Sequence, residues 1–213
     1  MDILGKLFGS EAKVRIMRLF LFNPETSFTN EEVAERAETT AASARHEIEV
    51  LRKMGFIKSR SVVRRVRNAR TKGRTSVRKK VAGWMLRASF SYLKELQRLL
   101  IEGSLLKADE LLRRFRSVGR LKLVIVAGIF IQDPDSRVDM IVVGERLKRG
   151  VLAHAVRSIE AELGKELRYA AFETDEFNYR LGMYDKLVRD ILDYPHTVVL
   201  DRLGLPPLRV ESR

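Results

Sequence analysis

Apolar residues recur at helical spacing near the start of the chain. Residues 14–21 carry them every three or four positions, Ser10 can cap the helix that they predict, and Pro24 prevents its simple continuation. Residues 29–32 follow, with the sequence Thr-Asn-Glu-Glu. This has the form of a capping box, so a second, short helix is expected from Thr29.

A third helix is predicted at about 41–54. Ala44, Ile48 and Leu51 fall on one face of it, and Gly55 is suited to end it. The second and third helices are separated by only a few residues. Two helices joined by a tight turn are typical of a helix-turn-helix unit.

The next segment changes to the pattern of a β-hairpin. Residues 56–63 and 77–84 are rich in β-branched side chains and predict two strands. The residues between them, 68–76, are polar and include Gly73. A hairpin over about 57–82 is therefore expected.

Two leucine-rich helices are expected between this region and the second half of the chain. Their apolar stripes cover residues 90–100 and 105–115, Ser104 can cap the second helix, and Gly119 can end it. The stripes fit either a buried core or a dimer contact.

The second half alternates between strand and helix patterns. The run at 121–131 is apolar enough for a buried strand. The expected elements after it are a strand at 138–144, a helix at 148–163, a strand at 167–172, a helix at 174–192 and a strand at 197–200. The fold class predicted for the whole chain is α+β. An N-terminal domain is expected at 1–88, a helical connector at 89–119 and a C-terminal α/β domain at 120–213.

Positive charge is concentrated in one window. The chain carries 41 Lys and Arg, 28 Asp and Glu, and a net charge of +13. Residues 52–87 hold 14 of the basic side chains and no acidic one, so the remainder, with 27 basic and 28 acidic residues, is balanced. A like-charge block repels itself unless a polyanion neutralises it, which makes nucleic acid the expected partner and a solvated or membrane-adjacent basic surface the alternative.

Composition excludes several classes of protein. There is no Cys, and His46, His154 and His196 lack metal-ligand spacing, so no disulfide framework, thiol nucleophile or metal site is expected. The longest uncharged apolar run, 123–131, is about half of what a membrane span needs. Residues 1–10 show no secretory signal, and a cytoplasmic location is expected.

The order of elements in the first half, with the exit sequence Leu51-Arg52-Lys53-Met54-Gly55-Phe56-Ile57, resembles the winged helix-turn-helix domains of transcriptional regulators over about residues 8–88. The resemblance implies that the helix at 41–54 enters the major groove of double-stranded DNA and that the hairpin is a wing on the backbone or in the minor groove. The residues expected to contact DNA are Thr40, Ala42, Ser43, Arg45, His46, Arg64, Arg65, Arg67, Arg70, Lys72 and Arg74.

These side chains suit different contacts. Arg45 can donate two hydrogen bonds to guanine, Ser43 or Thr40 can donate to a phosphate, and His46 can do either or remain solvated. The wing cations supply affinity more than base choice, although some can instead neutralise the acidic face of a neighbouring subunit.

The second half resembles, over about residues 105–200, the minimal nucleotidyltransferase domain. That family carries Gly-Ser after its first strand and two carboxylates before the next. Here Gly128 is followed by Ile129, and Arg137-Val138-Asp139 retains only the second acid. A guanidinium cannot bind Mg²⁺, so we expect a degenerate site with no cofactor, in which Asp139 has a structural role.

The sequence thus favours a homodimeric, sequence-specific DNA-binding regulator that is not an enzyme. Its C-terminal part would mediate assembly or bind an unknown effector. Two alternatives stay open: an active nucleotidyltransferase acting on RNA or protein, and a basic scaffold that binds DNA without base preference.

Overall fold

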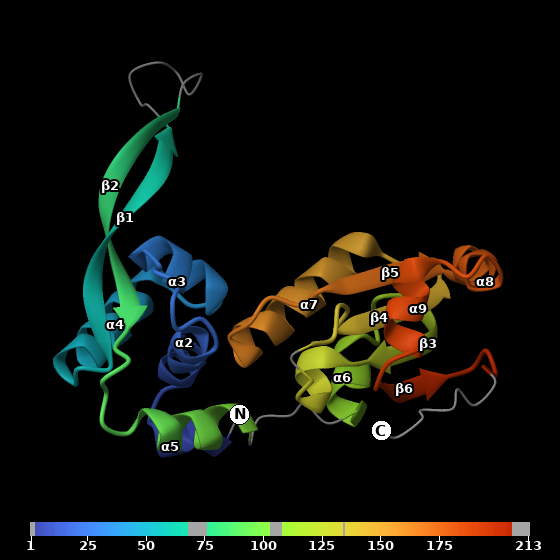
Figure 1. The fold of residues 1–213 in the computed structure, drawn as a ribbon, viewed down its shortest axis with the longest axis horizontal. Coiled ribbons are helices and arrows are strands. Elements are labelled where there is room, and N and C mark those ends of the chain that lie inside the picture. Colours follow the sequence, from blue (N-terminus) through green and yellow to red (C-terminus); the bar gives the residue numbers. More distant parts are fainter. Residues whose placement is uncertain (1–2, 68–75, 103–107, 134, 206–213) are drawn as a thin grey trace. The chain divides into compact units, whose positions relative to one another are not determined.

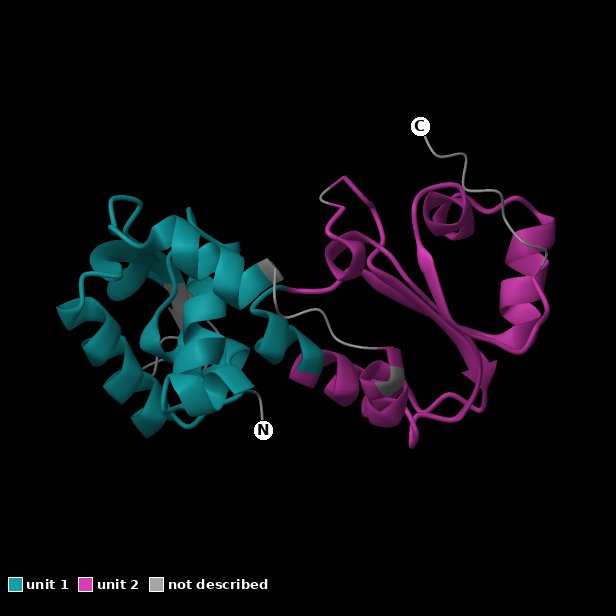
Figure 2. Cartoon of the chain, turned by 90° about the horizontal axis from the view of Figure 1, so that it is seen from below, with its two compact units in different colours: residues 1–104, 159–165 teal, residues 105–158, 166–213 magenta. Residues whose placement is uncertain are grey.

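The protein is a mixed α+β protein with two separate sheets (Figure 1). The structure is a computed structural model and describes residues 3–67, 76–102, 108–133 and 135–205. The chain divides into two compact units, which Figure 2 shows in different colours. Unit 1 comprises residues 1–104 and 159–165, and unit 2 comprises residues 105–158 and 166–213. The expected connector at 89–119 is thus divided between the two units.

Helices make up most of unit 1. They are α1 (Ile3–Leu7), α2 (Glu11–Phe22), α3 (Asn30–Arg36), α4 (Ala41–Lys53), α5 (Leu93–Gln97) and a π-helical turn, η2 (Arg98–Glu102). The predicted caps are present: Ser10 accepts a hydrogen bond from the amide of Lys13, and Thr29 and Glu32 form the capping box of α3. The short helix α1 was not expected from the sequence.

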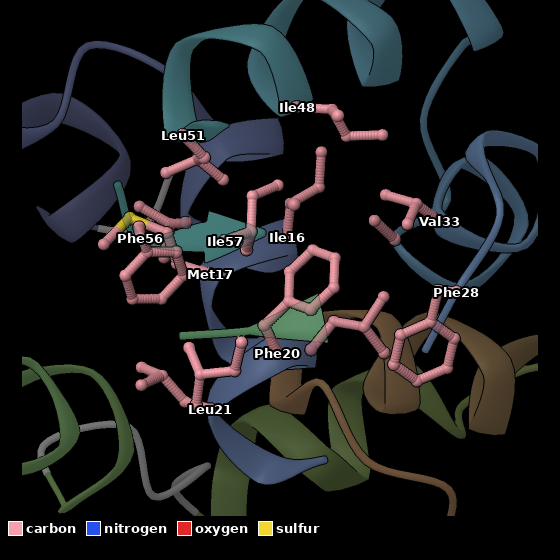
Figure 3. Packing of buried hydrophobic residues seen from close by; sticks show 14 of the residues in the cluster. Ile16, Met17, Phe20, Leu21, Phe28, Val33, Ile48, Leu51, Phe56 and Ile57 are labelled. Atoms are coloured by element: carbon pink, nitrogen blue, oxygen red, sulfur yellow. The ribbon is translucent and has the colours of Figure 1, made fainter. Parts of the chain in front are cut away.

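One apolar core holds these helices together (Figure 3). Apolar residues of α2, α3 and α4 are buried, including Met17, Val33 and Ile48, the last at a position that the helical spacing predicted to face inward. Phe20 and Phe28 meet edge to face, with ring centroids 5.8 Å apart. Since α4 shares this core with α2 and α3, its orientation on the unit is fixed by packing.

The hairpin is longer than the sequence indicated. Strands β1 (Ile57–Arg67) and β2 (Ser76–Leu86) pair antiparallel, with Ile57 opposite Leu86 and Arg67 opposite Ser76. At about 3.3 Å per residue, eleven paired residues extend roughly 36 Å. The predicted turn at 68–76 lies outside the described residues except for Ser76.

The end of one helix from the second half of the chain belongs to unit 1. The side chain of Arg18 in α2 is buried, with Nε donating to the carbonyl of Leu100 at 2.9 Å and Nη1 to that of Glu162 at 3.1 Å. Asn23 Nδ2 donates to the carbonyl of Gly164 at 3.0 Å. These bonds explain why residues 159–165 are part of unit 1.

Unit 2 contains a four-stranded mixed sheet with the order β5-β4-β3-β6. β3 pairs antiparallel with β4 and β6, and β4 pairs parallel with β5. The elements are β3 (Arg120–Val126), β4 (Met140–Glu145), β5 (Tyr169–Glu173), β6 (Thr197–Asp201), α6 (Ala108–Arg114), α7 (Arg149–Leu163), α8 (Thr174–Gly182) and α9 (Lys186–Leu192).

Two predictions for unit 2 are wrong. The strand expected at 121–131 ends at Val126, and a 3-10 turn, η3 (Gly128–Ile131), follows. The helix expected at 174–192 is two helices, because Tyr184 has φ of 54° and Asp185 caps a new helix by accepting from the amides of Leu187 and Val188. Among the described residues, no helix combines the length and apolar character that a membrane span requires.

Candidate nucleic-acid interface

Helix α4 presents one face to the core and the other to solvent. Ala44, Glu47, Ile48 and Leu51 are buried, whereas Thr40, Ala42, Arg45 and His46 are exposed and Ser43 is half-buried. Among the described residues, the side chains of Arg45 and His46 have no hydrogen-bond or ion-pair partner. Every residue that the sequence assigned to this helix face is therefore accessible at least in part.

The side chain of Thr40 caps the N-terminus of α4. Thr40 Oγ1 accepts a hydrogen bond from the amide of Ser43 at 3.1 Å. The hydroxyl hydrogen of Thr40 is not used in this bond and can still be donated to an anion. Ala41 and Ala42, in the first turn, are exposed and small, so a ligand backbone can approach closely there.

The last turns of α4 carry a charge cluster around Glu49, a residue expected on the outward face of this helix, whose pairing the sequence did not predict. Glu49 accepts two hydrogen bonds from Arg52, from Nε at 2.8 Å and from Nη2 at 2.6 Å. Lys53 Nζ lies 3.9 Å from Glu49 Oε1. The hydrogen bond from Arg52 holds the pKa of the Glu49 carboxyl below its usual range. The spacing of three and four residues was a visible signal for these pairs.

The hairpin places like charges opposite one another. In the register of the two strands, the backbone position of Arg64 is opposite that of Lys79, and the position of Arg65 is opposite that of Arg78. Like charges at opposed positions destabilise a sheet pair. Lys58, Arg60, Arg78, Lys79 and Lys80 are exposed, and none has an ion-pair partner in the part of the chain that the structure describes.

Arg64 differs from the free wing cation that was expected. Its Nε lies 2.6 Å from Glu32 Oε1, and its Nη2 donates to Glu32 Oε2 at 3.1 Å and to the carbonyl of Ser27 at 3.0 Å. Burial raises the pKa of the Glu32 carboxyl, but the hydrogen bonds from Arg64 and the Thr29 amide outweigh it and leave that pKa lowered. Arg64 thus attaches β1 to the capping box of α3.

A second contact attaches the other strand. The amide of Phe28 donates to the carbonyl of Trp84 at 2.9 Å, and the amide of Trp84 donates back at 2.8 Å. Trp84 Nε1 also donates to Asn30 Oδ1 at 2.7 Å. Together with Arg64, these bonds fasten both strands of the hairpin to the residues around the start of α3. No local sequence signal predicted these long-range pairs.

The remaining wing residues are described only in part. The backbone positions of Arg65 and Arg67 are in β1. Arg70, Lys72 and Arg74, which the sequence also assigned to DNA contact, lie outside the described residues.

In unit 2, Gly128 and Asp139 lie in contact. Asp139 is buried; its Oδ1 accepts from the amide of Ile129 at 3.2 Å, and its Oδ2 accepts from the amide of Arg168 at 2.8 Å and from Arg168 Nε at 3.3 Å. Gly128 has φ of 54°, and a Cβ there would collide with Asp139 Oδ1. The carboxylate is surrounded by donors, so it fixes the loop between β3 and β4.

Two further carboxylates of unit 2, those of Glu173 and Asp190, have partners as well. Glu173 accepts hydrogen bonds from the amides of Arg146 and Leu147, each at 2.9 Å, and Arg137 lies 3.6 Å from Asp190. Among the described residues, no group of three or more His, Cys, Asp or Glu side chains could hold a metal ion.

Comparison with protein-family models found no match, and neither the curated proteins nor the solved structures contained one that matches the chain.

Proposed function

We propose that the protein is a sequence-specific double-stranded DNA-binding regulator of the winged helix-turn-helix type. In this proposal α4 enters the major groove, and the hairpin β1–β2 contacts the backbone or the adjacent minor groove. The observation that carries it is a set of exposed cations without an ion-pair partner among the described residues, in a hairpin without acidic residues: Lys58, Arg60, Arg78, Lys79 and Lys80. A polyanion relieves the mutual repulsion of these cations.

The exposed face of α4 supports a role in base contact. A helix fits the width of the major groove, and the residues on its exposed face can approach base edges. Arg45 and His46 are exposed and Ala42 is small, so this face combines hydrogen-bond donors with space for close approach. Since the hairpin is fastened beside α3, the two proposed contact surfaces belong to the same unit.

For unit 2 we propose a role in assembly or in binding an effector, without transferase activity. Arg137 occupies the position of one expected metal-binding acid, and the carboxylate of Asp139 is already bonded to three donors. Incubation with labelled nucleoside triphosphates and Mg²⁺ is expected to give no transfer of label. Label transfer that disappears in Asp139→Ala would overturn this assignment.

Two measurements test the DNA-binding proposal. Titration of a duplex at several salt concentrations is expected to give a slope of log K against log salt of about −5 or steeper, if six or more phosphates are neutralised. Selection from random duplexes is expected to give a motif with two half-sites about one helical turn apart, as two copies of the chain would require. A flat salt response argues against the role of the wing, and equal affinity for random and selected duplexes favours a basic scaffold.

A further inference from the structure

We propose that Glu49 is a base-contacting residue of α4 and that it recognises cytosine, in a half-site where Arg45 recognises a guanine nearby. This inference rests on the proposed function of α4 as the helix in the major groove. It goes further because it assigns a base to a residue whose negative charge would ordinarily exclude it from a DNA surface.

Glu49 lies on the same exposed face of α4 as Arg45. It lies four residues after Arg45, so the two side chains are neighbours on the same stripe of the helix. Arg45 is exposed, and the side chain of Glu49 is 47% exposed. The buried face of α4 is formed by other residues, such as Ile48 and Leu51. A ligand that meets Arg45 on this face therefore has access to Glu49.

The negative charge of Glu49 is offset by neighbouring cations. An isolated carboxylate is repelled by the phosphates that line the groove. Here the Glu49 carboxylate accepts hydrogen bonds from Nε and Nη2 of Arg52 and lies close to Lys53. Because one acidic side chain is grouped with two basic ones, the three side chains together carry a net positive charge. The cluster can approach a polyanion, while the carboxylate itself is held in one orientation by the two hydrogen bonds.

The free lone pairs of the Glu49 carboxylate favour one base as a partner. An ionised carboxylate only accepts, and its two oxygens offer about four lone-pair sites, of which Arg52 occupies two. In the major groove the amino groups of cytosine and adenine are the donors. Adenine places the acceptor N7 beside its amino group, and this lone pair repels a carboxylate. Cytosine has no such acceptor, which leaves it as the favoured base.

The distance between Arg45 and Glu49 along α4 predicts the distance between the two bases that they contact. Four residues correspond to about 6 Å along a helix axis, or roughly two base-pair steps. A helix lying along the groove would therefore place the cytosine contacted by Glu49 within two base pairs of the guanine contacted by Arg45. Arg52 acts as a positioning residue, because it orients the carboxylate.

The test is selection from random duplexes with the full chain and three variants: Glu49→Gln, Arg52→Gln and the control Glu95→Gln. Glu95 is exposed on α5 and undergoes the same change in charge. For the unaltered chain we expect cytosine at one position within two base pairs of a guanine, favoured by about tenfold. In Glu49→Gln the preference there should change to adenine, because glutamine can both donate to N7 and accept from the amino group.

Arg52→Gln should weaken the cytosine preference and leave the other positions of the motif unchanged, and Glu95→Gln should leave every position unchanged. A motif that is identical for the unaltered chain and Glu49→Gln would overturn the proposal while leaving sequence-specific binding intact. The absence of any motif with the unaltered chain would instead overturn the proposed function, and this inference with it. Titration of Glu49→Gln against duplexes changed only at that position gives an independent measure of the same preference.

Discussion

Arg64 of β1 and Glu32 of α3 form a two-point ion pair, with Nε 2.6 Å from Oε1 and Nη2 3.1 Å from Oε2. The same carboxylate closes the capping box, since Glu32 Oε2 also accepts from the Thr29 amide at 2.8 Å. One side chain thus serves both the start of a helix and the attachment of the hairpin. Glu32 thus holds the proposed wing against the start of α3 through Arg64, three residues before the end of β1.

Replacing Arg64 with methionine is expected to lower the free energy of unfolding by about 1 kcal/mol, because the pair is only partly shielded from water. Chemical denaturation measures this change. Lys79→Met is the matched control, since Lys79 lies opposite Arg64 and has no ion-pair partner among the described residues. Equal effects of the two substitutions would show that the Glu32 pair contributes nothing specific.

The same pair predicts a pH dependence. The pKa of Glu32 is lowered in the folded protein from its ordinary value of 4.5. Its contribution to stability is therefore fully present above pH 4.5 and is lost as the pH falls through the folded-state pKa. Denaturation curves below pH 4.5 should show a smaller slope of stability with pH in Arg64→Met than in the unaltered chain. Identical slopes would contradict the prediction.

The cations of β2 should determine the salt dependence of DNA binding. Replacing Arg78, Lys79 and Lys80 with glutamine is expected to make the slope of log K against log salt shallower by up to about 0.9 for each phosphate that is no longer neutralised. The affinity for all duplexes should fall by a similar factor. Lys94→Gln, an exposed change on α5, should leave the slope unaltered. An unchanged slope in the triple variant would exclude this strand from the interface.

Asp139 should matter for stability. Asp139→Ala leaves the amides of Ile129 and Arg168 without their acceptor in the interior, so a loss of about 3 kcal/mol is expected. Asp193→Ala is the control, because Asp193 pairs with Arg189 at the surface and its loss should cost less than about 1 kcal/mol. If Asp139→Ala unfolds at the same denaturant concentration as the unaltered chain, the structural role is wrong.

Two glycines should respond in opposite directions to alanine. At Gly83 a Cβ would lie 2.5 Å from Val62 Cγ2 and 3.3 Å from the carbonyl oxygen of Phe28, so Gly83→Ala should destabilise the hairpin by about 1–3 kcal/mol. At Gly150 a Cβ meets nothing within 4 Å, and the residue is in α7. Gly150→Ala should therefore stabilise the protein by up to about 1 kcal/mol. Thermal unfolding distinguishes the two, and two shifts of equal sign would contradict this prediction.

Local features of the sequence were predictable because their partners are close in the chain. Ser10 bonds to a residue three positions later, and so do Thr29 and Thr40. The helical spacing also identified the buried face of α4. By contrast, the contacts that attach the hairpin join residues 32 and 54 positions apart, and no pattern in either segment specifies its partner.

The sequence by itself determined the α+β class, the caps and inward faces of the first helices, and the concentration of positive charge between residues 52 and 87. Only the tertiary structure decided that Arg64 is paired and that β3 ends at Val126. The physical reason is that periodicity and capping depend on neighbours along the chain. Which charge is paired, and where a strand must stop, depend on groups brought together by folding, as Asp139 is with Gly128.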